Sequence, residues 1–437
     1  MAADPLTTGL LGLAAMFLLI ILQVPVGIAM GVIGVVGTGL IIGFEPALTL
    51  LATEPSSAMA AEGLAVIALF LLMGNLAHSG GLSDELYRLA YAFLGHRRGG
   101  LIFATVGACA GFGAICGSSV ATTATMARIA LPQMIERGYA RSLAAGAIAS
   151  GGTLGMIIPP SVVMILYAIL TENSIITLFL AAIVPGLLAV FFYFIAIGFV
   201  VRLFPETAPR GERLSWRQRG RETRNSWAVV LLAVSVSGGI YSGIFTVAEA
   251  AAVGASMALV ISIARRRLTG KSFLASLGDT ASNTGLIFVI IIGASVFSYF
   301  ATLSGLPAAI VAWIEALGLP PLGVIALLML FFLVLGSIFD TIAAMVLTLP
   351  FVYPLVIGLG YDPIWWGVIN IVVIELGMIT PPIGINVFVL HGMARKLPLK
   401  TIFRGVTPFL LADLVRLIVL ILFPGLSLWL PSLLGWL

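Results

Sequence analysis

Leu154-Gly155-Met156-Ile157-Ile158-Pro159-Pro160 returns later in the chain as Leu376-Gly377-Met378-Ile379-Thr380-Pro381-Pro382, and both strings lie inside long apolar segments. Proline has no N–H to donate to the carbonyl four residues back, so each Pro-Pro pair frees two carbonyl groups. In lipid, an unsatisfied carbonyl costs several kcal/mol. The repeated string therefore predicts two membrane helices that break at matching places. Two simple proline kinks are the alternative, and repetition of the whole string argues against them.

Each predicted break presents binding groups inside the membrane. The freed carbonyl oxygens suit a cation. A new half-helix starts beyond the prolines, because proline suits the first helical turn, and its free N–H groups and positive dipole end face an anion. Two broken helices at matching places in the two halves of a chain are a sequence signature of a transporter binding site. Candidate site residues are therefore Pro159, Pro160, Pro381 and Pro382.

Composition places the chain in a membrane. Of its 437 residues, 60% are hydrophobic and 9% are charged, whereas soluble domains carry about 25% charged residues. The net charge of +4 does not indicate nucleic-acid binding, because the basic residues lie in short loops between apolar runs. Cys109 and Cys116 lie roughly 10 Å apart along one predicted helix, too far for a disulfide, and we interpret them as packing residues. We predict an all-α polytopic membrane protein.

The apolar runs predict the individual helices. We expect membrane spans at 6–22, 25–43, 62–79, 177–201, 226–241, 245–264, 283–303 and 405–430, an interfacial helix at 46–60, polar stretches at 83–100 and 202–224, and broken helices at 139–171 and 364–393. Two pairs of runs are shorter than the roughly 20 residues that a span requires, which predicts re-entrant hairpins. They are 101–116 with 119–132 around Gly117-Ser118, and 322–335 with 338–350 around Gly336-Ser337.

Loop charge predicts the topology, because cytoplasmic loops are rich in Lys and Arg. The Lys/Arg-containing segments are 81–100, 133–141, 202–224, 265–271 and 394–404, and the segments without Lys or Arg are 171–176, 242–246, 304–321 and 358–363. The spans between them alternate consistently. This places the mouth of the first hairpin on the cytoplasmic side and that of the second on the opposite side. The two repeats therefore have inverted topology, with a site expected near the midplane between them.

We expect one sodium site in each half, where a hairpin tip meets a break. Hydroxyl and carbonyl oxygens suit a small hard cation, and the sequence has no Cys/His set for a transition metal. The first site would use Ser118 or Ser119 with carbonyls near Gly152, Gly155 and Ile158; the second would use Gly336-Ser337 with a carbonyl near Gly377 and the Thr380 hydroxyl. Helix packing is the alternative role for each serine. Further candidates at the tips and breaks are Gly117, Thr122, Asp340, Thr341 and Asn386.

Charged residues inside apolar runs are functional candidates, because a charge at the bilayer centre costs at least ~2.5 kcal/mol. Glu249, Asp340 and Glu375 lie in such runs, and Asp340 is close enough to a tip to help bind a cation. For Glu249 we favour a structural, hydrogen-bonded carboxyl. Arg128 either extends to the cytoplasm or contacts an anionic substrate. The sequence leaves open whether Glu249, Glu375 and Arg128 are functional.

No enzyme is predicted. Gly117-Ser118-Ser119 is not a nucleophile elbow, since it lacks a strand–helix pattern and a nearby histidine. The sequence also has no phosphate-binding loop or ATPase motif. Transport would have to be driven by an ion gradient or by a partner protein.

Motifs across nearly the whole chain are similar to one family. They are Gly99-Gly100-Leu101, Gly113 to Thr122, Leu131-Pro132-Gln133-Met134, Gly138-Tyr139, Gly152-Thr153-Leu154-Gly155, Ile158-Pro159-Pro160-Ser161, Thr246 to Ala251, Gly377 to Pro382, and Asn386. With them the chain resembles the large membrane subunit of the tripartite ATP-independent periplasmic (TRAP) transporters. It departs from the family at Val247-Ala248, where members often have Pro-Thr, and at Cys116, where many have Ser.

The resemblance implies a fold of the ion-transporter superfamily, with a fixed scaffold and a moving elevator domain that holds both hairpins. It implies sodium-coupled uptake of an organic acid delivered by a periplasmic binding protein, with a small four-helix membrane subunit as second partner, in the bacterial inner membrane. A self-sufficient sodium-coupled carboxylate or anion symporter of the same superfamily is the alternative. We expect both termini to be periplasmic and loop 202–224 cytoplasmic. The sequence does not identify the organic acid.

We divide the chain into five parts on this basis. They are N-terminal scaffold spans (1–80), repeat 1 with the first hairpin and broken helix (81–201), a cytoplasmic loop with connecting scaffold spans (202–303), repeat 2 with the second hairpin and broken helix (304–402), and a C-terminal span (403–437).

Overall fold

The computed structural model describes residues 4–437. Within this range the chain is helical, with no strand beyond a single bridge between Arg98 and Arg210. Six helices are long and apolar enough to cross a membrane, or up to eight if each of two bent helix pairs counts as one span. This confirms the predicted all-α membrane fold.

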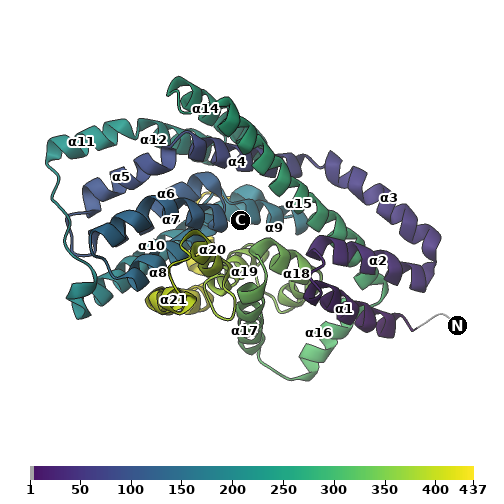
Figure 1. Ribbon diagram of the computed structural model, residues 1–437. Coiled ribbons are helices and arrows are strands. Elements are labelled where there is room, and N and C mark those ends of the chain that lie inside the picture. The colour runs from purple at the N-terminus through teal and green to yellow at the C-terminus, as the bar shows by residue number, and fades with distance from the viewer. Residues whose placement is uncertain (1–3) are drawn as a thin grey trace.

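The first half of the chain contains both expected elements of repeat 1. Hairpin 1 consists of α6 (Gly100–Cys116) and α7 (Ser119–Glu136), and the first broken helix consists of α8 (Arg141–Ile157) and α9 (Val162–Leu170), bent by 41° at residues 158–161, which we call break 1. The other helices are α1 (Pro5–Ile21), α2 (Val26–Ile42), α3 (Phe44–Ala60), α4 (Glu62–Ser79), α5 (Leu82–Leu94) and α10 (Ile175–Leu203). In Figure 1, α1–α3 lie together on one side of the molecule, opposite α5–α8.

The second half contains the corresponding elements. Hairpin 2 consists of α17 (Pro321–Ile338) and α18 (Thr341–Gly358), and the second broken helix consists of α19 (Pro363–Gly377) and α20 (Ile385–Met393), separated by residues 378–384, which we call break 2. The remaining elements are η1 (Pro205–Thr207), α11 (Trp216–Asn225), α12 (Trp227–Ala233), the π-helical η2 (Val234–Gly238), α13 (Gly239–Tyr241), α14 (Val247–Ala264), α15 (Gly270–Leu303), α16 (Leu306–Ala316), α21 (Leu399–Leu422) and α22 (Gly425–Leu433).

One sequence offset relates the two halves. Pro160 and Pro382 are 222 positions apart. The same offset brings α5 onto α16, α6 and α7 onto α17 and α18, α8 and α9 onto α19 and α20, and α10 onto α21, each to within a few residues. The correspondence also extends to α4 and the C-terminal part of α15. The repeated unit is therefore a leading helix (α4 or the C-terminal part of α15), a short helix, a hairpin, a broken helix and a long helix.

The bases of the two hairpins lie at opposite ends of α10, whose 29 residues span about 43 Å. At its C-terminal end, the Ala140 N–H after hairpin 1 donates to the Thr207 carbonyl (2.8 Å). Before its N-terminal end, Asn173 donates to the Tyr353 hydroxyl of hairpin 2 (3.2 Å). The hairpins therefore open in opposite directions, which confirms the inverted topology predicted from loop charge.

Glycines allow the closest helix contacts. A Cβ built on Gly405 of α21 would lie 1.8 Å from the Ser142 carbonyl oxygen of α8, and one on Gly293 of α15 would lie 1.9 Å from the Gly27 carbonyl oxygen of α2. Without a side chain, these backbones approach closely, which is the usual way that membrane helices gain packing contacts. The α8–α21 and α2–α15 pairs are among the most extensive helix contacts of the molecule.

Three segments assigned to loops contain helices that the sequence analysis did not predict. The helix α5 overlaps the polar stretch 83–100, α11 overlaps the polar stretch 202–224, and α16 lies within 304–321, a segment without Lys or Arg. These helices are 10 to 13 residues long. They are too short to span a membrane, so a search for apolar runs of roughly 20 residues does not detect them.

Candidate functional site

A cavity of about 320 Å³ lies where both hairpin tips, both broken helices and the helices α4 and α15 meet. Hairpin 1 contributes Gly117 and Ser118, hairpin 2 contributes Asp340, and α4 and α15 contribute Asn75 and Asn283. Apolar residues complete the lining, including Met156, Val162, Val163, Leu286, Ile287, Ile290 and Met378. We call it the central cavity. Asp340 is the one charged residue among its lining residues.

The tip of hairpin 1 is a tight turn that touches break 1. Gly117 has φ +63°, a left-handed conformation that favours glycine. A Cβ built on it would lie 3.1 Å from the Pro160 carbonyl oxygen. Ser118 then caps α7, its Oγ accepting from the Ala121 N–H (3.4 Å), while its carbonyl accepts from the Thr122 hydroxyl (2.7 Å). The sequence placed this tip correctly.

The tip of hairpin 2 lies three residues beyond the predicted Gly336-Ser337. The helix α17 continues to Ile338, and Asp340 caps α18 by accepting from the N–H groups of Ile342 (2.8 Å) and Ala343 (3.1 Å). Asp340 and Ser118 are 222 positions apart, so the carboxylate occupies the place of the serine hydroxyl in the other repeat. The prediction of a turn at Gly336-Ser337 is therefore wrong.

Gly336 serves helix packing instead. A Cβ built on it would lie 2.6 Å from the Ile374 carbonyl oxygen of α19, much as one on Gly113 of α6 would lie 2.4 Å from the Gly155 Cα of α8. The neighbouring Ser337 donates its hydroxyl to the Val334 carbonyl within its own helix (2.7 Å). Its carbonyl accepts from the Gly384 N–H (2.9 Å), which ties hairpin 2 to break 2.

Oxygen atoms lie beside both broken helices close to the breaks, and both Pro-Pro peptide bonds are cis. At break 1, a Cβ built on Gly155 would lie 2.8 Å from the Thr122 hydroxyl and 3.0 Å from the Ser118 carbonyl oxygen. At break 2, one on Gly384 would lie 3.1 Å from the Thr380 carbonyl oxygen. The Thr380 hydroxyl donates to the Leu376 carbonyl (2.6 Å). Several oxygens thus gather beside each break.

Other predicted residues make contacts between or within the repeats rather than line the cavity. The Asn386 amide, on α20, donates to the Ser119 hydroxyl (2.5 Å) and to the Ala149 carbonyl (3.2 Å) of repeat 1. The Thr341 hydroxyl donates to the Met378 sulfur (2.9 Å). A Cβ built on Gly152 would lie 1.9 Å from the Thr123 hydroxyl, so this glycine packs α8 against α7. These contacts hold the tips and breaks together as one unit.

Sequence reasoning missed several polar residues. Asn75 donates to the Thr280 hydroxyl (2.9 Å) and, with Asn283, brings amide groups of α4 and α15 to the central cavity. In α21, Asp413 pairs with Arg416 (3.0 Å) and accepts from the Tyr193 hydroxyl; the side chains of the ion pair are each 1% exposed. The signal for the pair was present, because two opposite charges three residues apart interrupt the last apolar run.

The other three charged candidates, Glu249, Glu375 and Arg128, lie at a helix start, in the protein interior and on the exposed surface, respectively. Glu249 forms a capping box with Thr246 at the start of α14, accepting from its N–H (2.8 Å), which fits the structural role that we favoured. Glu375 is 1% exposed, and neither of its carboxylate oxygens has a hydrogen-bond partner within residues 4–437. Arg128 is exposed on α7.

Comparisons with known proteins agree on one family. A family sequence model described as "Tripartite ATP-independent periplasmic transporter, DctM component" matches residues 13–426. The chain is 36% identical over 405 residues to the C4-dicarboxylate TRAP transporter large permease protein DctM of Pseudomonas aeruginosa, covering 90% of this chain and 94% of that protein. It is 29% identical to the sialic acid TRAP transporter large permease protein SiaM of Vibrio cholerae, covering 85% and 86%.

Two further similarities extend the comparison. The ectoine/5-hydroxyectoine TRAP transporter large permease protein UehC of Ruegeria pomeroyi is 32% identical, with 85% of this chain and 86% of that protein covered. Among solved structures, the YdaH transporter of Alcanivorax borkumensis superposes with a TM-score of 0.58 at 18% identity, covering 88% of this chain and 89% of that one. At this identity, the structural similarity concerns the fold alone.

Proposed function

Because this chain belongs to the DctM-component family of tripartite ATP-independent periplasmic transporters, we propose that it takes up an organic carboxylate by sodium-coupled transport through the central cavity. The chain is a large permease subunit of a transporter and not an enzyme. The observation that carries the proposal is the cavity itself, where both tips and both broken helices meet α4 and α15. The relatives are named for C4-dicarboxylates, sialic acid and ectoines.

The charge of the cavity supports coupling to cations. Its lining includes Asp340 and no lysine or arginine. A carboxylate substrate would therefore meet a like charge, which disfavours binding unless positive charge enters with it. The N-terminal ends of α7 and α18, at the two tips, provide only partial positive charge. Sodium ions that bind with the substrate would supply the remainder.

We place the two sodium sites beside the breaks. In repeat 1 the ligands are the Ser118 carbonyl and Thr122 hydroxyl, which face Gly155. In repeat 2 they are carbonyl oxygens near Gly384 and the Thr380 hydroxyl. Oxygen donors of this kind suit a small hard cation. Ser337 contributes its carbonyl, because that oxygen is the one that contacts Gly384 of break 2.

The arrangement suits an elevator movement. Hydrogen bonds from Asn386 to repeat 1 and from Gly384 to Ser337 join both hairpins and both broken helices into one unit. The scaffold helices α4 and α15 form the other wall of the central cavity. Sliding of this unit along α4 and α15 would carry a bound substrate across the membrane. A small membrane subunit would brace the scaffold, and a periplasmic binding protein would deliver the substrate, in the bacterial inner membrane.

Reconstitution tests the proposal. The chain is placed in proteoliposomes with or without the small subunit and the binding protein of its genomic neighbourhood, and uptake of a radiolabelled carboxylate recognised by that binding protein is measured with and without a sodium gradient. We expect uptake only when sodium and both partners are present. Uptake by this chain alone with sodium would instead indicate a self-sufficient symporter, and uptake indifferent to sodium would exclude the proposed coupling.

Substitutions at the tip of hairpin 1 test the ligand assignment. Thr122→Val removes the hydroxyl that faces Gly155 and preserves the shape of the side chain. We expect it to raise the sodium concentration needed for half-maximal uptake. Thr348→Val is the matched control, because Thr348 is a buried threonine of hairpin 2 whose hydroxyl also bonds within its helix but faces neither Gly155 nor Gly384. Equal sodium dependence of the two variants would remove Thr122 from the proposed site.

A further inference from the structure

A second cavity, of about 550 Å³, lies away from the central cavity, where α5, α11, α12 and the end of α14 meet. Its lining residues are Glu85, Arg88, Arg224, Asn225, Trp227, Arg265 and Arg267. Four guanidinium groups thus surround one space with a single carboxylate in its wall. We call it the arginine pocket.

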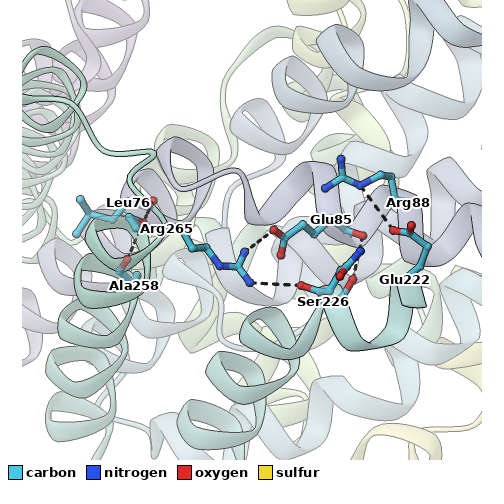
Figure 2. A network of polar contacts seen from close by, with 9 residues as sticks. Leu76, Glu85, Arg88, Glu222, Ser226, Ala258 and Arg265 are labelled. Carbon is cyan, nitrogen blue, oxygen red and sulfur yellow. Dashed lines mark hydrogen bonds and ion pairs between the residues drawn. The ribbon is translucent and has the colours of Figure 1, made fainter. Parts of the chain in front are cut away.

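Two of the four arginines have acidic partners, and both pairs are visible in Figure 2. Arg265 forms an ion pair with Glu85, and Arg265 also donates to the Asn225 carbonyl (3.3 Å). The Arg88 side chain lies 3.8 Å from the Glu222 carboxylate and is 50% exposed. These contacts fix the position of Arg265. The rest of the positively charged lining comes from Arg224 and Arg267.

The other two arginines, Arg224 and Arg267, form no ion pair with any residue of the described range. Arg267 is nevertheless held in place. A Cβ built on Gly81, at the start of α5, would lie 2.1 Å from a guanidinium nitrogen of Arg267, so the glycine provides the space that this side chain uses. The pocket therefore carries an excess of two positive charges.

Apolar surface continues from the pocket. Trp227, at its edge, is 53% exposed, and the exposed side chains of Val230, Leu231 and Val234 follow it along one side of α12 and η2. On the adjacent α14, Val260 and Ile263 are 64% and 57% exposed. In a membrane protein, such side chains face lipid, and a tryptophan at the end of such a stripe marks the level of the lipid headgroups.

We propose that the arginine pocket binds the headgroup of an anionic phospholipid, whose acyl chains lie along α12 and α14. The phosphate neutralises Arg224 and Arg267, and two phosphates, as in a cardiolipin, match the excess charge of the pocket. Basic pockets between helices at a membrane surface bind such headgroups, and arginine forms paired hydrogen bonds with phosphate. The bound lipid would link the short helix α5, which leads into hairpin 1, to the scaffold helices α12 and α14.

Native mass spectrometry of the purified full-length chain tests this. The protein is incubated with an equal mixture of cardiolipin, phosphatidylglycerol and phosphatidylethanolamine, and the retained lipid is identified. We compare Arg224→Gln/Arg267→Gln with Arg221→Gln/Arg266→Gln, which makes the same charge change at exposed neighbours outside the pocket. Since each arginine near a lipid surface changes binding about fivefold, the first variant should bind anionic lipid roughly thirtyfold more weakly, and the control should bind as the parent does.

Three results of the lipid-binding measurement would overturn the proposal, and a fourth comes from a phosphate control. The three are equal loss of anionic lipid in both double variants, retention of phosphatidylethanolamine as strong as that of cardiolipin, and loss of the lipid when the small membrane subunit is bound. Inorganic phosphate is added alone in a parallel thermal-unfolding series. If phosphate stabilises the parent as much as cardiolipin does, the pocket is a site for free phosphate and not for lipid. None of these outcomes depends on uptake, so they are distinct from failure of the proposed transport function.

Discussion

Replacing Asp340 separates two roles that the structure gives to one carboxylate. The side chain caps α18 through two backbone hydrogen bonds, at 2.8 and 3.1 Å, and it also brings the only charge to the lining of the central cavity. Asparagine caps a helix about as well as aspartate but carries no charge, whereas alanine provides neither function. Asp340→Asn therefore tests the charge, and Asp340→Ala tests the charge and the cap together.

The size of the cavity sets the expected effect. A space of about 320 Å³ is only about 8 Å across if it is roughly spherical. A sodium ion at the Ser118 carbonyl, in the wall of the same space, would lie about 8 Å from the Asp340 carboxylate, an attraction of about 2 kcal/mol at an effective dielectric constant of about 20. Asp340→Asn should thus weaken sodium binding about thirtyfold and change the free energy of unfolding little. Asp340→Ala should in addition lose about 1 kcal/mol of stability.

Two measurements are needed. Uptake in proteoliposomes at increasing sodium concentration gives the half-saturating value for each variant, and thermal unfolding in detergent without sodium gives the stability. If Asp340→Asn takes up substrate with the sodium dependence of the parent, the carboxylate is only a helix cap, and the electrostatic argument for coupling is wrong.

Two further predictions concern packing and buried charge, and both are read from thermal unfolding in detergent. Gly405→Ala should destabilise the protein by about 1–3 kcal/mol or more, because the added Cβ would lie 1.8 Å from a backbone oxygen of α8. The control Gly198→Ala, whose added Cβ would have no atom within 4 Å, should be neutral or slightly stabilising. Equal effects of the two substitutions on unfolding would contradict the close α8–α21 contact. Arg416→Met should cost about 3–5 kcal/mol by leaving Asp413 buried without its partner. Arg416→Met/Asp413→Leu should recover much of that loss, and failure to recover any would show that the pair does more than balance charge.

The sequence predicted those features that depend on local chemistry. A pair of prolines inside an apolar run interrupts the helical hydrogen bonds, so both breaks were found at their residues. The inverted arrangement followed from loop charge, since Lys and Arg mark one side of the membrane whatever the tertiary contacts are. The first tip was found because its turn needs a glycine in the left-handed conformation, and Gly117 is that residue.

The second tip was misplaced because one dipeptide serves two purposes. Gly-Ser forms the turn at residues 117–118, but at 336–337 the glycine admits a neighbouring helix, and the turn is made by Phe339 and Asp340 without a glycine. The offset of 222 between the proline pairs would have assigned Asp340 to the position of Ser118. Asn75 and Asn283 were not predicted for another reason: they are uncharged polar residues on two helices far apart in the sequence, and only packing shows that both face one cavity.

The interruption of both broken helices also affects the exchange of backbone hydrogens with solvent deuterium. Among the amides of residues 158–161 and 378–384, those of Ser161 and Ile383 make no backbone hydrogen bond within residues 4–437, and that of Gly384 donates to Ser337 of hairpin 2 instead of within a helix. Amides of this kind open at low free energy and exchange early. Rapid deuterium exchange should therefore appear at each break, inside otherwise protected segments. Slower exchange at a break after sodium is added would report that the sodium site of that repeat is occupied, without any measurement of transport.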